Sequence, residues 1–154
     1  MKGLVIIMAK FVYKMQNILE IKYKLETQAK TAYAEANNRL TEEELKLDAI
    51  HNDINGYEEE IRMISRSQLD VAKLRWCSEA IEIKKLAAEE QKMAIEKARK
   101  QVELARIKLN EIMVDRKTHE KLREHAFEDF KQEIADEEKK EVDELVSFKF
   151  NKAK

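Results

Sequence analysis

The sequence has no proline and only two glycines, Gly3 and Gly56, among its 154 residues. These two residue types mark most turns, so their scarcity excludes a fold made of many short elements joined by loops. Aromatic residues are also few, at 6%, although 44% of the chain is hydrophobic. That hydrophobic content argues against simple disorder. A chain rich in Ala, Glu, Lys, Leu and Ile without helix breakers is typical of long helices and coiled coils.

No excess of charge of either sign exists, because 30 basic residues are interspersed with 31 acidic ones, for a net charge of −1. The chain therefore lacks the basic surface that nucleic acids or anionic membranes would require, and no nucleic-acid partner is expected. One cysteine, Cys77, excludes an intrachain disulfide and weakly favours a reducing, cytosolic location. It follows Trp76 and has no histidine or aspartate nearby, so a buried or bystander thiol is expected rather than a nucleophile.

The longest apolar run near the N-terminus is "LVIIMA", residues 4–9, which has six residues. That is too short for the apolar core of a signal peptide or for the roughly twenty residues of a membrane-spanning helix. We therefore expect no direct membrane insertion. Residues 1–8 are predicted to be a flexible extension, and the hypothesis is that Met8, rather than Met1, is the effective start.

The apolar periodicity predicts an all-α fold, a long two-helix antiparallel coiled-coil hairpin over residues 9–150 whose second helix is longer than the first. Helix one is expected at about 10–64, the turn at about 65–67 and helix two at about 68–148. Leu47 to Ile64 gives the cleanest heptad run, and two steps of four around Leu40 predict a stutter there. Ser67 and Asp70 resemble a capping box. Gly56 lies inside the heptad run and is assigned to the helix rather than to the turn.

Folding the chain about residue 66 would place Phe11 opposite about Lys121. The second helix would then extend past the first by about 25 residues, or about 40 Å at 1.5 Å per residue. That overhang would carry seven large apolar side chains: Phe127, Phe130, Ile134, Val142, Leu145, Phe148 and Phe150. Apolar residues at helical spacing without an internal partner indicate a binding surface for another protein. The alternatives are that the overhang folds back, frays or pairs in a homodimer.

No motif in the sequence predicts an enzyme or a cofactor. A Gly-rich phosphate loop is absent. The segment "HEKLREH", residues 119–125, places His119 and His125 about 120° apart on a helix, which is unsuited to zinc. Tyr57 and Trp76 flank the expected turn, where they could form part of the core or a docking patch.

Three segments resemble the FliJ family of flagellar export proteins. Residues 11–36, "FVYKMQNILEIKYKLETQAKTAYAEA", resemble the opening of these proteins, and residues 65–86, "SRSQLDVAKLRWCSEAIEIKKL", resemble their turn and the start of their second helix. Residues 137–150, "EEKKEVDELVSFKF", resemble their closing signature, which is matched at Glu138, Lys140, Asp143, Glu144 and Leu145. The similarity covers nearly the whole chain from Met8.

The resemblance implies a non-enzymatic, stalk-like part of the type III export apparatus that serves flagellum assembly and motility. It implies three partners, which are the hexameric export ATPase, an export-gate membrane protein and export chaperones, and a cytoplasmic location at the inner face of the cell membrane. The implied contacts with the ATPase ring are Phe11, Tyr13, Met15, Leu19, Lys140, Asp143, Glu144 and Leu145. The implied contacts with the export gate are Tyr57, Trp76, Ile83 and Leu86. The alternatives are a general coiled-coil adaptor, an export chaperone without a stalk role, or the stalk of an injectisome.

Overall fold

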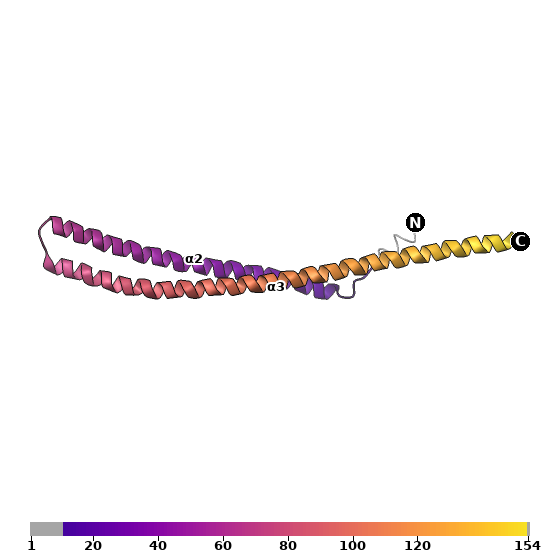
Figure 1. The fold of residues 1–154 in the computed structure, drawn as a ribbon, viewed down its shortest axis with the longest axis horizontal. Helices are drawn as coiled ribbons and strands as arrows, with labels where there is room; N and C mark the ends of the chain where they lie inside the picture. Colours follow the sequence, from indigo (N-terminus) through magenta and orange to yellow (C-terminus); the bar gives the residue numbers. More distant parts are fainter. Residues whose placement is uncertain (1–10, 154) are drawn as a thin grey trace. The chain divides into compact units, whose positions relative to one another are not determined.

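The computed structural model describes residues 11–153, and the predicted extension of residues 1–8 lies outside this range. Helix α2 spans Gln16–Arg66 and helix α3 spans Val71–Lys152 (Figure 1), and the described residues contain no strand. The prediction of an all-α fold with a longer second helix is therefore confirmed. Helix α2 begins later than position 10, because the amide of Gln16 donates to the carbonyl of Tyr13 over 3.0 Å in a turn.

The chain divides into two compact units, and both helices contribute to each. We call Gln28–Asn110 the loop unit, and the described residues up to Thr27 together with those from Glu111 onward the terminal unit. In the loop unit α2 and α3 lie side by side and run antiparallel (Figure 1), since contacts pair Asp53 with Lys84 and Glu43 with Gln91. The same order holds in the terminal unit, where Glu26 contacts Arg116 and Tyr23 contacts Glu120.

The connection between the helices is only four residues long, and Asp70 ends it by capping α3. The Asp70 Oδ1 atom accepts a hydrogen bond from the backbone amide of Lys73 over 3.2 Å, which satisfies one of the free amides at the start of the helix. Ser67 instead donates its hydroxyl to the carbonyl of Met63 over 3.2 Å, as part of the end of α2. The predicted capping box is therefore wrong, because Asp70 itself is the N-cap.

A seam of buried and half-buried residues follows α2 in unbroken steps of three and four. Its members are Leu19, Lys22, Glu26, Ala29, Tyr33, Ala36, Leu40, Glu43, Leu47, Ile50, Ile54, Tyr57, Ile61 and Ile64. The predicted stutter at Leu40 is wrong, because Glu26 and Glu43 occupy heptad positions that an apolar pattern does not reveal. In α3 the first buried residues are Cys77, Ile81 and Ala88. A strict 3.5-residue repeat is the spacing of left-handed coiled coils.

Gly56 lies inside α2, as expected, and its backbone has ordinary negative φ. The space that a Cβ atom at position 56 would occupy is open, with no neighbouring side chain within 4 Å. Gly56→Ala should therefore stabilise the chain by about 0.5–1 kcal/mol, because alanine loses less backbone entropy in a helix interior. Urea unfolding followed by circular dichroism measures this change, and an equal or lower midpoint for the variant would contradict it.

Candidate protein-binding surfaces

An aromatic cluster holds the start of the described chain against α3 in the terminal unit. The ring of Phe11 lies 5.0 Å from that of Phe127 at an interplanar angle of 64°, and 5.0 Å from that of Phe130 at 43°. Ile134 is buried as well. The predicted register, with Phe11 opposite Lys121, is therefore wrong. Three of the seven residues assigned to the overhang are covered, and the exposed part of α3 is shorter than expected.

Every described residue from Lys139 onward is exposed, and we call residues 139–153 the C-terminal segment. It carries large apolar side chains that are 57–63% exposed: Val142, Leu145, Val146, Phe148 and Phe150. Val142, Leu145 and Val146 share one face of α3, since they are three and four residues apart. Lys140 and Glu144 lie on the opposite side of the helix from this face, and Asp143 lies about 100° around the helix from Val142. The segment thus presents an apolar face on one side and charges of both signs elsewhere around the helix, which is the composition of a protein-binding helix.

The four predicted ATPase contacts near the start of the chain differ in exposure. Phe11 and Tyr13 are half-buried, and Met15 is exposed. Leu19 is buried in the seam, where its side chain packs rather than faces a partner. We therefore assign Leu19 to the support of the surface, while the contact roles of the other residues remain predictions.

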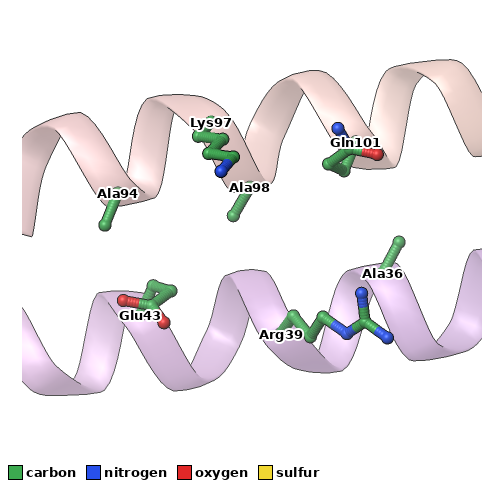
Figure 2. A pocket seen from close by; sticks show the side chains of 7 residues that line it. All are labelled: Ala36, Arg39, Glu43, Ala94, Lys97, Ala98 and Gln101. Atoms are coloured by element: carbon green, nitrogen blue, oxygen red, sulfur yellow. The ribbon is translucent and has the colours of Figure 1, made fainter.

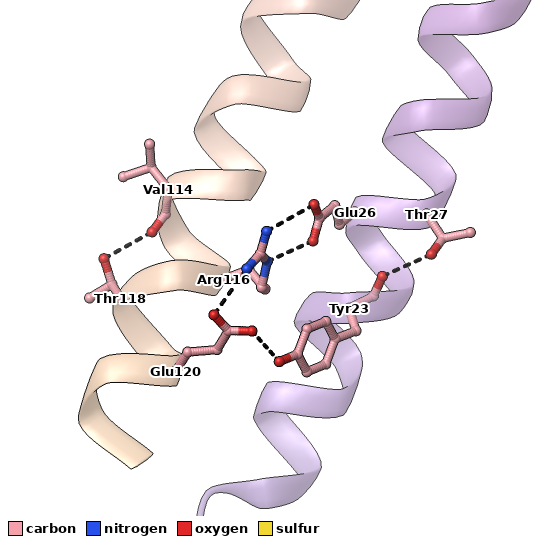
Figure 3. A network of polar contacts seen from close by, with 7 residues as sticks. All are labelled: Tyr23, Glu26, Thr27, Val114, Arg116, Thr118 and Glu120. Atoms are coloured by element: carbon pink, nitrogen blue, oxygen red, sulfur yellow. Dashed lines mark hydrogen bonds and ion pairs between the residues drawn. The ribbon is translucent and has the colours of Figure 1, made fainter. Parts of the chain in front are cut away.

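Beside the aromatic cluster, a polar network ties α2 to α3 (Figure 3). Arg116 donates from Nε to Glu26 Oε2 over 2.7 Å, from Nη2 to Glu26 Oε1 over 3.2 Å, and from Nη1 to Glu120 over 3.0 Å. The hydroxyl of Tyr23 donates to the second oxygen of Glu120. Lys22 and Asp115 form an ion pair of 2.6 Å in the same unit.

These hydrogen bonds and ion pairs shift the pKa values of the groups that form them, and each shift favours the state of the group that makes the contact. The bond to Glu26 raises the pKa of Arg116, and burial opposes this. The Tyr23 hydroxyl, and then Arg116, hold the pKa of Glu120 below its usual value, while the same bond raises the pKa of Tyr23. Lys22 lowers the pKa of Asp115. The shifts of Arg116, Glu120, Tyr23 and Asp115 each favour the charge state that the group ordinarily has at neutral pH, so the network is structural rather than an acid–base pair.

In the loop unit, four predicted gate contacts lie in or close to one surface. The rings of Tyr57 and Trp76 are 5.7 Å apart at 78°, an edge-to-face arrangement. Tyr57 is half-buried, whereas Trp76, Ile83 and Leu86 are exposed. An open groove runs past Tyr57, Trp76 and Ile83. Tyr57 therefore belongs to the seam, and Trp76 presents its free side to the groove.

A second groove lies between the helices of the loop unit (Figure 2). Ala36 of α2 and Ala94 and Ala98 of α3 form its floor, and their small side chains leave an open hollow of about 250 Å³. Arg39, Glu43, Lys97 and Gln101 complete its lining. Next to it, the Gln91 side-chain amide donates to the Glu43 backbone carbonyl over 2.9 Å. The lining contains no cysteine, serine or histidine that could act as a nucleophile or base.

Among the described residues, no group of three or more His, Cys, Asp or Glu side chains is placed to hold a metal ion. His119 lies 3.6 Å from Asp115, and His125 is exposed. Neither described helix contains a stretch long and apolar enough to cross a membrane.

Two long helices joined by a four-residue connection define a helical hairpin of the coiled-coil class. A family model described as "Flagellar FliJ protein" matches residues 11–154. The chain therefore belongs to the FliJ family, and it is a component of flagellar protein export rather than a member of an enzyme family. No curated protein and no solved structure matches the chain.

Proposed function

We propose that the protein is the stalk-like coiled coil of the flagellar export ATPase complex, and that it binds the hexameric ATPase ring through its C-terminal segment. The observation that carries the proposal is the exposure of Val142, Leu145, Val146 and Phe148 on a segment whose residues are all exposed. Exposed apolar surface of this kind favours burial against a partner by about 25 cal/mol per Å².

The aromatic cluster supports the same assignment. Phe11 anchors the N-terminal residues against Phe127 and Phe130, so the surface next to the C-terminal segment has a fixed arrangement within the terminal unit. A fixed surface loses less entropy on binding than a disordered one. Phe11, Tyr13 and Met15 thereby complement Lys140, Asp143, Glu144 and Leu145 in the proposed contact.

A single coiled coil cannot contact six identical subunits in the same way. Its binding energy therefore favours one subunit conformation over the others, and a ligand shifts an equilibrium by its differential affinity for the two states. In this way the chain would raise ATP turnover in the ring without contributing a catalytic group. Trp76, Ile83 and Leu86 remain available for the export gate at the inner face of the cell membrane, and export chaperones are the third proposed class of partner.

Leu145→Asp should abolish most of the stimulation of the cognate export ATPase, because a charge replaces an apolar side chain in the proposed contact. The matched control is Leu45→Asp, since Leu45 is 61% exposed and Leu145 is 60% exposed. We expect at least about a tenfold weaker affinity for the ring with Leu145→Asp, and wild-type behaviour with Leu45→Asp. Phosphate release at rising concentrations of the chain measures both.

A chain that ends at residue 136 tests the same surface without a point substitution. It should keep its helical circular dichroism and lose stimulation. Equal stimulation by the wild type, Leu145→Asp and the shortened chain would contradict the stalk assignment. Tight capture of chaperones with unchanged ATP turnover would instead support an adaptor or export chaperone.

A further inference from the structure

Helix α3 has a second apolar stripe in the loop unit, separate from its seam with α2. We call the following six residues, which are 42–76% exposed, the outer stripe: Trp76, Ile83, Leu86, Met93, Leu104 and Ile107. Apart from Val71 at the first position of the helix, they are the exposed large hydrophobic residues of α3 in this unit. Successive members are 7, 3, 7, 11 and 3 residues apart, and each of these separations is a sum of steps of three and four. The outer stripe therefore keeps a heptad phase, as a coiled-coil seam does.

From Ile83 onward the outer stripe faces away from α2, whereas the ring of Trp76 packs edge-to-face on Tyr57 of α2. Each member lies two residues beyond a buried or half-buried seam position, as Ile83 lies beyond Ile81 and Leu104 beyond Val102. Two residues correspond to about 200° around a helix. Helix α2 cannot cover this face, and a heptad stripe of this length indicates another helix as its partner.

We propose that the partner is a second copy of this chain, which packs its own outer stripe antiparallel against the first. Four apolar residues of the outer stripe are placed symmetrically about Ile95. Ile83 and Ile107 are each twelve residues from Ile95, and Leu86 and Leu104 are each nine residues from it. A two-fold axis at this position therefore pairs Ile83 with Ile107 of the second copy and Leu86 with Leu104 of the second copy, each pair occurring twice.

The charges in the stripe favour this alignment. Glu90 and Lys100 are each five residues from Ile95, so they form opposite-charge pairs across the axis. Met93 meets the aliphatic stem of Lys97. A parallel pair would instead place Glu90, Lys97 and Lys100 each against its own copy, which is unfavourable. Between Ile83 and Ile107 the contact is about 36 Å long.

The flanks of the stripe allow the helices to approach. Ala87 and Ala94 lie on one side and have no bulk that would hold a second helix away. On the other side, the glutamates are neutralised within α3 by cations three residues later, in the ion pairs Glu82–Lys85, Glu89–Lys92, Glu96–Arg99 and Glu103–Arg106. One pair of residues opposes the dimer, because Glu79 would lie against Glu111 of the second copy and the two negative charges repel each other. It lies outside the four apolar pairs and limits the length of the contact.

This dimer is independent of the proposed ATPase contact, since the outer stripe and the C-terminal segment share no residue. It does share Ile83 and Leu86 with the predicted gate surface. The dimer therefore protects that apolar surface from nonspecific contacts, and it has to separate before the gate can use Ile83 or Leu86.

Light scattering after size exclusion tests the self-association. The wild type should reach twice the 18.2 kDa of one chain as its concentration rises. Leu86→Asp should remain a single chain at concentrations where the wild type is fully dimeric, with unchanged helical circular dichroism. Leu45→Asp, which replaces a leucine of similar exposure on α2, should dimerise as the wild type does. A wild type that stays at one chain, or a Leu86→Asp variant that dimerises normally, would overturn the proposal.

Cysteine pairing tests the antiparallel arrangement. Ile83→Cys and Ile107→Cys chains should form an intermolecular disulfide when they are mixed, whereas each variant alone should not. The native Cys77 is buried and should not contribute. Disulfides within each single variant would show a parallel pair and overturn the arrangement. A second test exchanges charges, because Glu90→Lys should weaken the dimer and addition of Lys100→Glu should restore it.

Discussion

Arg116→Leu is expected to destabilise the protein by about 3 kcal/mol, because it leaves the carboxylate of Glu26 inside the helix pair without its guanidinium. The side chains of Arg116 and Glu26 are only 16% and 8% exposed. Arg116 makes two bonds to Glu26 and one to Glu120, so the substitution also brings these two carboxylates together without a cation between them. Urea unfolding followed by circular dichroism measures the loss.

Two further variants separate the ion pair from simple packing. The double variant Glu26→Leu with Arg116→Leu should recover most of the lost stability, because apolar residues of similar size often replace a buried ion pair at little cost. Arg106→Leu removes an arginine that also makes two bonds to a glutamate, Glu103, but the pair is exposed and little change is expected. A similar loss for Arg106→Leu and Arg116→Leu would show that burial of the pair does not matter.

Glu26 also explains why the sequence predicted the fold better than the register. The absence of proline and the heptads between Leu47 and Ile64 were sufficient to predict two long helices. Glu26 and Glu43 occupy seam positions in the structure. Because they are not apolar, a search for apolar periodicity passes over them and assigns neighbouring apolar residues to a heptad with a different phase. The predicted stutter arose in this way. A buried glutamate is recognisable only when its partner, here Arg116 on the other helix, is known.

The same limitation affected α3, where two apolar stripes share one helix. Trp76 and Ile83 are seven residues apart and therefore also fit a heptad, but Cys77 and Ile81 occupy the seam with α2, whereas Trp76 and Ile83 are exposed. Both stripes have heptad spacing, so periodicity alone could not choose between them.

The exposed apolar residues near the C-terminus were predicted only in part. Exposure of Val142, Leu145 and Phe148 agrees with their assignment to an overhang. The partial burial of Phe127 and Phe130 was not predicted, because the register of the two helices was derived only from the position of the turn, taken as residue 66. The structure instead pairs Phe11 with these two rings. Val146 was overlooked, although its spacing of four from Val142 already placed it on the same face.

Cys77 should react with a thiol reagent about a thousandfold or more slowly in the folded protein than in urea. Its side chain has no exposed surface. Burial, and then the neighbouring Glu60 carboxylate, raise the pKa of the Cys77 thiol, so the reactive thiolate is disfavoured as well. Reaction then requires opening of the loop unit, whose free energy sets the rate.

The matched control moves the thiol by one position. Ser78 is exposed, so a Cys77→Ala chain with Ser78→Cys should react nearly as fast as the unfolded protein. Equal rates for Cys77 and for the cysteine at position 78 would contradict the burial of Cys77. Addition of a destabilising change such as Arg116→Leu tests whether the two units open together. If they do, the reaction rate of Cys77 should increase. If the loop unit opens alone, the rate should stay the same, because that opening does not break the Arg116 contacts.

The raised pKa of Cys77 also predicts how stability depends on pH. Below the pKa of an unfolded thiol, about 8.5, both states hold the proton and the full contribution to stability is present. Above it the unfolded chain releases the proton while folded Cys77 retains it, so stability falls as pH rises toward the folded pKa. Urea midpoints at increasing pH should therefore decrease more steeply for the wild type than for Cys77→Ala. Parallel decreases for the two proteins would show that the thiol keeps an ordinary pKa in the fold.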